Sequence, residues 1–177
     1  MSGGLFTNMR LRETQKGDSP EWVERLLNLH AASYKRRSLD VQPLSGAREL
    51  FTFLADAQIP WAITSSERMD TARPVLEQLE IDFDRVVIVT RDQVRFAKPD
   101  LDPFLTAAER LGVQIETASV IGDSVWDMLA SRRARALGIG LLSGGYGREE
   151  LERAGAYRVY EDPADFLHRI DEVAGRQ

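Results

Sequence analysis

The chain has 177 residues, 43% apolar and 29% charged, which is the composition of a globular domain with a core of its own. A net charge of −5 predicts no nucleic-acid partner and disfavours anionic membrane surfaces. The absence of cysteine excludes disulfides and zinc–thiolate sites, and two histidines are too few for a multi-histidine metal site.

The sequence also bears on where in the cell the protein is located. No apolar run approaches the ~18 residues of a membrane span. The first ten residues lack the basic and apolar regions of a secretory signal. We therefore expect a cytoplasmic protein with no membrane partner.

The first 40 residues read as helical. Ser19 is expected to cap a helix that has Pro20 at its first position and runs to about residue 38. A shorter helix is expected within 5–15. No strand-like run precedes residue 60, so this segment is predicted to be a helical piece placed before a sheet.

From residue 44 the pattern alternates between helical and strand periods. A helical stripe over 44–57 is followed by short apolar runs at 60–65, 85–90, 119–123, 138–143 and 157–160. Helical patterns separate or follow these runs at 71–79, 102–112, 124–138, 148–156 and 163–175. Pro74 and Pro103 are expected in first helical turns, and Gly112 and Gly138 at helix C-termini. Apolar strands alternating with helices predict a doubly wound α/β fold with a parallel sheet covered on both faces.

Polar residues follow three of the predicted strands. They are Ser65 and Ser66, Lys98, and the pair Asp123 and Asp127. Ligands of open parallel sheets bind at the carboxyl ends of the strands. Hydroxyl groups and a lysine suit a phosphate, and paired carboxylates suit Mg²⁺. The sequence predicts a phosphate site of Ser65, Ser66 and Lys98 beside a Mg²⁺ site of Asp123 and Asp127.

Each of these residues also has a purely structural interpretation. Ser65 could cap the next helix, and Lys98 could be an exposed loop residue. Asp123 could be an N-cap, and Asp127 a first-turn carboxylate favoured by the helix dipole. Their common placement at strand ends favours the ligand site.

Together these residues resemble the motifs of the haloacid dehalogenase superfamily. Ser65 after WAIT matches the second motif, Lys98 within KPDLDPF the third, and GDSVWD at 122–127 the fourth. The segment 138–166 is similar to the branch of phosphoglycolate phosphatase and β-phosphoglucomutase. The resemblance covers 41–177. It implies a Rossmann-like core and a Mg²⁺-dependent phosphatase of a small phosphorylated metabolite, with Lys98 and Ser65 in the catalytic site.

The first motif of that family, DxDGT at the end of the first strand, has no match. Two Asp-x-Asp strings exist, at Asp82 and Asp100, but neither follows an apolar strand or precedes Gly-Thr. Both read as turn and helix-cap residues. The resemblance implies that the nucleophilic aspartate and the central strand are missing, and that 1–40 is the remnant of a helical cap before the core at 41–177.

Two consequences follow from the missing motif. Without the nucleophile the covalent route is closed, so the chain as given is expected to be inactive. Without the central strand, two strand edges are exposed, so marginal stability and self-association through these edges are expected. Two alternatives to a phosphatase stay open. One is a non-catalytic pseudo-phosphatase that binds phosphate, Mg²⁺ or a partner, and the other is an unrelated doubly wound binding domain.

Overall fold

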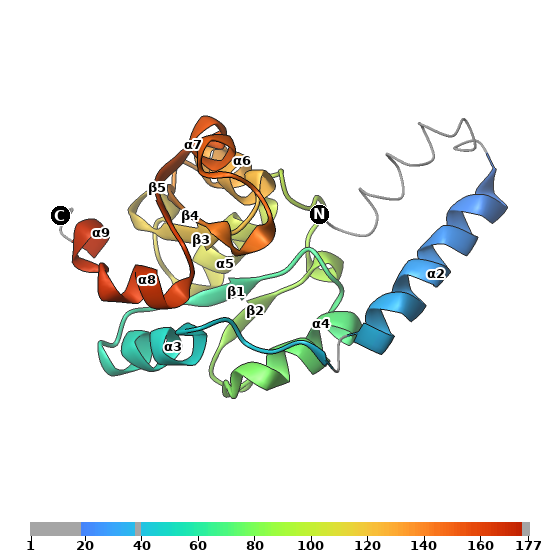
Figure 1. The fold of residues 1–177 in the computed structure, drawn as a ribbon, viewed down its shortest axis with the longest axis horizontal. Coiled ribbons are helices and arrows are strands. Elements are labelled where there is room, and N and C mark those ends of the chain that lie inside the picture. Colours follow the sequence, from blue (N-terminus) through green and yellow to red (C-terminus); the bar gives the residue numbers. More distant parts are fainter. Residues whose placement is uncertain (1–18, 38–39, 175–177) are drawn as a thin grey trace.

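A computed structural model describes residues 19–37 and 40–174. Its strands are β1 (Ala62–Thr64), β2 (Val87–Val89), β3 (Ser119–Gly122), β4 (Leu137–Leu141) and β5 (Ala156–Tyr160). Its α-helices are α2 (Pro20–Arg37), α3 (Ala47–Asp56), α4 (Met69–Leu76), α5 (Asp102–Leu111), α6 (Val125–Ala134), α7 (Arg148–Ala154), α8 (Pro163–His168) and α9 (Asp171–Ala174). Strands and helices alternate from β1 onwards, which confirms the predicted α/β class (Figure 1).

The strands form two parallel sheets. One sheet pairs β1 with β2, and the other has the order β3-β4-β5. Within the described residues no strand pairing joins the two sheets. The predicted parallel arrangement is confirmed, and its division into two sheets is consistent with the expectation that a strand between them is missing.

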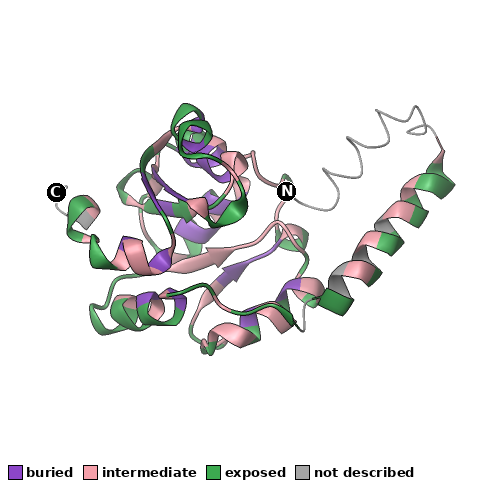
Figure 2. Cartoon of the chain, viewed as in Figure 1, coloured by how far each residue is buried: buried purple, intermediate pink, exposed green. Residues whose placement is uncertain are grey.

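Helices cover the strands through separate apolar clusters. On the first sheet, Ala72 and Leu76 of α4 pack against Ile88 of β2. On the second sheet, the largest cluster joins α3, α8, β4 and β5 through Leu50, Ile139, Leu141, Tyr160 and Phe166. The buried residues in Figure 2 accordingly lie on β2 to β5 and on the helices packed against the sheets, whereas β1 is half-buried throughout. The core is therefore built by helix–sheet packing on each sheet.

Two helices connect the sheets. Leu50 of α3 belongs to the cluster on β4 and β5, whereas Phe51 stacks on Trp61, just before β1, with ring centroids 4.6 Å apart. On α5, Phe104 packs with Val120 of β3 and Ala130 of α6, and the same helix lies against β1 and β2. Side-chain packing thus fixes the position of the two sheets relative to each other.

The positions predicted for proline and glycine are confirmed in two of four cases. Pro103 lies in the first turn of α5, and Gly112 ends that helix with φ 68°, as predicted. Pro74 is inside α4, because that helix begins at Met69, two residues before the predicted start. The prediction that Gly138 ends a helix is wrong, since Gly138 lies in β4. The helix α6 stops at Ala134, and Arg135 takes the left-handed conformation instead.

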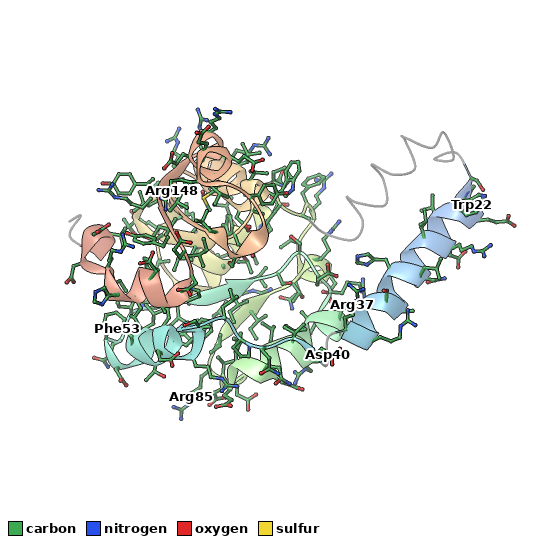
Figure 3. All side chains as sticks on the ribbon, in the orientation of Figure 1. Trp22, Arg37, Asp40, Phe53, Arg85 and Arg148 are labelled. Atoms are coloured by element: carbon green, nitrogen blue, oxygen red, sulfur yellow. The ribbon has the colours of Figure 1, made fainter. Side chains whose placement is uncertain are left out.

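The helix α2 begins where the sequence predicts. The carbonyl of Ser19 accepts hydrogen bonds from the backbone N–H groups of Trp22 and Val23, at 3.1 and 3.2 Å. Trp22 lies at the end of α2 far from the α/β body and Arg37 at the near end (Figure 3). The helix expected within 5–15 lies outside the described residues, and the division at residue 40 stays a prediction. No described helix has the length and hydropathy needed to cross a bilayer.

Candidate functional site

The carboxyl ends of β1, β2 and β3 meet at one lysine. Lys98 follows β2, and its Nζ lies 2.8 Å from Oδ1 of Asp127 in the first turn of α6. The same Nζ donates a hydrogen bond of 3.0 Å to the carbonyl oxygen of Thr64, the last residue of β1. Residues 34 positions apart along the chain are thus joined at the sheet edge where ligands of parallel sheets bind.

Lys98 is well enclosed. Its side chain is 12% exposed and that of Asp127 10%. The ammonium also lies 5.2 Å from the centre of the Phe104 ring, a favourable cation–π distance. The interpretation of Lys98 as an exposed loop residue is therefore wrong. An ion pair this buried needs further partners to offset its desolvation, and Thr64 and Phe104 supply them.

The helix cap at this site is Ser124. Its hydroxyl accepts a hydrogen bond of 3.3 Å from the Asp127 N–H and donates to Oδ2 of the same residue. The interpretation of Asp123 as the N-cap is therefore wrong, because Ser124 holds that position. Asp127 lies in the first turn as expected, but Lys98 and Ser124 bind both of its oxygens.

Two glycines let the backbone pass close to the acids. A Cβ on Gly122 would lie 2.4 Å from Cβ of Asp127. A Cβ on Gly144, in the turn after β4, would lie 2.0 Å from the carbonyl oxygen and 2.8 Å from Cγ of Asp123. No side chain fits at position 122 or 144. Asp127 and Asp123 therefore pack directly against the backbone of these glycines.

The carboxyl of Asp123 is bound by no other described side chain, only by the N–H of its own backbone. The residue is exposed, yet the atoms of the site desolvate its carboxyl, and this effect raises its pKa above the ordinary 3.8. The negative charge of Asp127 raises the pKa further, and the positive charge of Lys98 lowers it in part. The two acids are thus close enough to repel each other, as acids that share a cation do.

We expect Asp123→Asn to raise the melting temperature at pH 7 in Mg²⁺-free buffer. A carboxyl whose pKa is raised by folding destabilises the fold fully above the raised pKa, and this cost disappears as the pH falls through that value towards 3.8. The stabilisation by Asn should therefore vanish near pH 4, where scanning calorimetry can follow it. A melting temperature unchanged at pH 7 would contradict this account of Asp123.

Ser65 and Ser66 follow β1, half-buried. The hydroxyl of Ser65 accepts a hydrogen bond of 3.1 Å from the N–H of Glu67. It does not cap a helix, because α4 begins at Met69 with Arg68 as its N-cap. Ser65 is also the next residue after Thr64, which binds Lys98. The role of both serines in phosphate binding stays a prediction.

The Asp-x-Asp strings have the turn and cap contacts expected of them. Oδ1 of Asp82 accepts from the N–H of Asp84 at 3.0 Å, in the turn before β2. Asp102 is the first residue of α5 and its N–H donates to Oδ1 of Asp100 at 3.2 Å. Neither string ends a strand, so neither is placed as a nucleophile at the carboxyl edge.

The donor set fits Mg²⁺. This ion prefers hard oxygen ligands and usually takes one or two carboxylates while keeping several waters. Asp123 offers a carboxylate, and Asp127 stands close by with both oxygens bound inside the site. No cluster of three or more acids or histidines suited to a metal occurs in the described part of the chain.

Four contributors were not found from the sequence. The carbonyl of Thr64 carries no side-chain signal, and Phe104 and Gly144 reach the site only through folding. Ser124 did carry a signal, since Ser-x-x-Asp at the start of a helical pattern is typical of a capping arrangement.

Comparison with known proteins agrees with this geometry. The profile of the haloacid dehalogenase-like hydrolases matches residues 5–140. A phosphoglycolate phosphatase of Agrobacterium fabrum is 30% identical over 136 residues, 76% of this chain and 57% of that protein. An N-acetylmuramic acid 6-phosphate phosphatase of Pseudomonas aeruginosa is 30% identical over 66% of this chain and 52% of its own. The chain thus spans little more than half the length of these relatives.

Solved structures show the same fold. A hydrolase from Pseudomonas syringae superposes with a TM-score of 0.90 at 48% identity, over 98% of this chain and 79% of its own. A HAD family hydrolase from Deinococcus radiodurans, solved with bound phosphate and sodium, has a TM-score of 0.72 at 25% identity, over 93% of this chain and 72% of its own. With a family profile matching most of its length, this chain belongs to the haloacid dehalogenase-like hydrolases.

Proposed function

We propose that the site holds the phosphate of a small phosphorylated metabolite beside Mg²⁺, as the phosphate-binding part of a phosphomonoester hydrolase. The observation that carries the proposal is the enclosed ammonium of Lys98 at the junction of three strand ends, next to two coupled carboxylates. Two curated phosphatases of phosphorylated small molecules are each 30% identical, which supports this substrate class.

Each residue has a distinct part in this proposal. Lys98 neutralises a phosphate oxygen, and the hydroxyls of Ser65 and Ser66 donate hydrogen bonds to the other oxygens. Asp123 and Asp127 hold the cation, which shields the charge of the phosphate. Phosphate would compete with Asp127 for Lys98, so its binding draws the lysine away from the acid.

The 177 residues hold no aspartate in a first-strand motif, so this chain alone is proposed to bind without turnover. This matches the second candidate, a pseudo-phosphatase that keeps the phosphate and metal groups. Phosphoglycolate is the first substrate to try, because phosphoglycolate phosphatases recur among the relatives. From the sequence we also propose a cytoplasmic location for the protein.

The test is calorimetric titration of the 177-residue chain with Mg²⁺, then with inorganic phosphate in its presence, alongside a turnover assay with p-nitrophenyl phosphate. We expect saturable binding of both ions and no turnover. Asp123→Asn should abolish Mg²⁺ binding, and Asp84→Asn, in the turn before β2, should leave it unchanged. Absence of Mg²⁺ and phosphate binding in the unsubstituted chain would refute the proposal.

A further inference from the structure

The two loops that carry the proposed phosphate ligands follow neighbouring strands. The serine loop, residues 65–68, connects β1 to α4 and holds Ser65 and Ser66, and the lysine loop, residues 90–101, follows β2 and holds Lys98. Because β1 and β2 pair directly and in parallel, both loops leave the same edge of the first sheet (Figure 1). One phosphate can contact the serines and the lysine together only if the two loops keep a fixed position relative to each other.

Backbone hydrogen bonds join the two loops next to the sheet. The N–H of Ser65 donates to the carbonyl oxygen of Val89 at 2.8 Å, which continues the pairing of β1 with β2. The N–H of Arg91 donates to the carbonyl oxygen of Glu67 at 2.9 Å. These bonds hold the serine loop as far as Glu67, and a side chain holds the start of α4 that follows it.

That side chain is Asp92 of the lysine loop. Its Oδ1 accepts a hydrogen bond of 3.1 Å from the N–H of Met69, the first residue of α4. The same oxygen accepts a hydrogen bond of 2.8 Å from the hydroxyl of Thr90, directly after β2. One carboxylate oxygen thus ties the beginning of α4 to the end of β2.

The helix α4 has no cap from its own segment. Its N-cap residue is Arg68, whose side chain makes no capping hydrogen bond. The first N–H groups of a helix need an acceptor, and a carboxylate at this end also interacts favourably with the helix dipole. Asp92 supplies both, although it lies 23 residues after Met69 in the chain. The cap of α4 is therefore a contact between the two loops.

Thr90 holds the carboxylate of Asp92 in place. The side chain of Thr90 is fully buried, whereas Asp92 is exposed. The hydrogen bond from the Thr90 hydroxyl is the main cause that lowers the pKa of Asp92 below the ordinary 3.8, so this group is charged at neutral pH. A carboxylate repels phosphate and is no ligand for it. The contacts of Asp92 suit a residue that orders the groups around it.

We propose that Asp92 is a positioning residue for phosphate binding, which fixes the serine loop relative to Lys98 by capping α4 from the lysine loop. This role rests on the proposed function of the site and extends it to a residue that touches no ligand. Groups that bind one ligand must be held to within about 0.5 Å by their neighbours. Loss of the cap releases the serine loop, while Lys98 keeps its contacts with Thr64 and Asp127.

The test compares the binding of inorganic phosphate to the unsubstituted chain and to Asp92→Ala by calorimetric titration at saturating Mg²⁺. We expect Asp92→Ala to weaken phosphate binding at least tenfold. The Mg²⁺ affinity should stay unchanged, because the acids proposed for Mg²⁺ follow β3 and lie outside both loops. Asp92→Asn keeps an oxygen that can accept both hydrogen bonds, so its phosphate affinity should stay within about threefold of the unsubstituted chain. Thr90→Val should cause an intermediate loss, since the carboxylate then has one donor fewer.

Asp82→Ala is the matched control. Asp82 is also an exposed aspartate whose Oδ1 accepts a backbone N–H, that of Asp84 at 3.0 Å, but it lies before β2, at the opposite end of that strand from Asp92. Its substitution removes the same charge and the same kind of hydrogen bond, so the affinities for phosphate and Mg²⁺ should stay unchanged. Hydrogen exchange gives a second readout. The amide of Met69 should exchange faster in Asp92→Ala and at the unsubstituted rate in Asp82→Ala.

The outcomes separate the role of Asp92 from the proposed function. Absence of phosphate binding in the unsubstituted chain would overturn both. Phosphate binding that Asp92→Ala leaves unchanged or strengthens would overturn the positioning role alone, since the carboxylate would then contribute nothing or only repulsion. An equal loss of phosphate and Mg²⁺ affinity in both Asp92→Ala and Thr90→Val would do the same, because it would indicate a general loss of structure.

Discussion

Lys98→Met should lower the free energy of unfolding by about 3 kcal/mol, because it leaves the buried carboxylate of Asp127 without its cation. It should also weaken inorganic phosphate binding at least tenfold, since the ammonium at the junction of the three strand ends is lost. Urea unfolding and calorimetric titration measure the two effects.

A double-mutant cycle separates the interaction energy of the Lys98–Asp127 pair from the effects of the two single substitutions. Asp127→Asn alone should be destabilising as well, but the double variant should cost clearly less than the sum, since neither charge is then left unpaired. The matched control is Arg153→Ala, which breaks the Arg153–Glu149 pair at 79% and 80% exposure and should change stability by less than about 0.5 kcal/mol. An additive cycle, or an equal loss of stability in Lys98→Met and Arg153→Ala, would show that the Lys98–Asp127 pair contributes no more to stability than an exposed pair.

Gly144→Ala should cost about 3 kcal/mol and lower Mg²⁺ affinity, because the new methyl group would overlap the backbone and carboxyl carbon of Asp123. The turn after β4 must then move away from the end of β3. Chemical unfolding and Mg²⁺ titration of the same variant test both parts.

The neighbouring glycine is the control. Gly145 has φ 80°, and no atom lies within 4 Å of the position that a methyl group would take there, so Gly145→Ala meets only backbone strain. It should cost about 1 kcal/mol and leave Mg²⁺ binding unchanged. If Gly144→Ala and Gly145→Ala changed the Mg²⁺ affinity equally, overlap of the new methyl group with Asp123 would not be the cause of the change.

The sequence by itself determined the α/β class and the position of most elements. Apolar runs alternating with helical stripes are a property of local order, so β1 to β5 were located to within a few residues. Its errors were local as well. Pro74 lies inside α4 and Gly138 lies in a strand, because one helix starts earlier and another ends sooner than the local residues indicate.

The candidate site was determined by sequence only as a set of residue types. Strand-end placement predicted Lys98 and Asp127 at the same edge, and folding placed them 2.8 Å apart. Lys98 and Ser124 bind both oxygens of Asp127, whereas no other described side chain binds the carboxyl of Asp123. This difference is a three-dimensional result, since it depends on rotamers and on which residue caps α6.

Only the tertiary structure decided how the parallel strands divide. Strand pairing depends on which segments lie beside each other. The resemblance implied two exposed strand edges, and the structure shows β1 paired with β2 alone and β3 with β4 alone among the described residues. The exposure of Ile121 and the hydrogen bond from Lys98 to Thr64 O became visible only when both strands were placed. Local residue order thus determined the elements and the chemistry available, while contacts between distant segments decided which groups meet and which edges stay open.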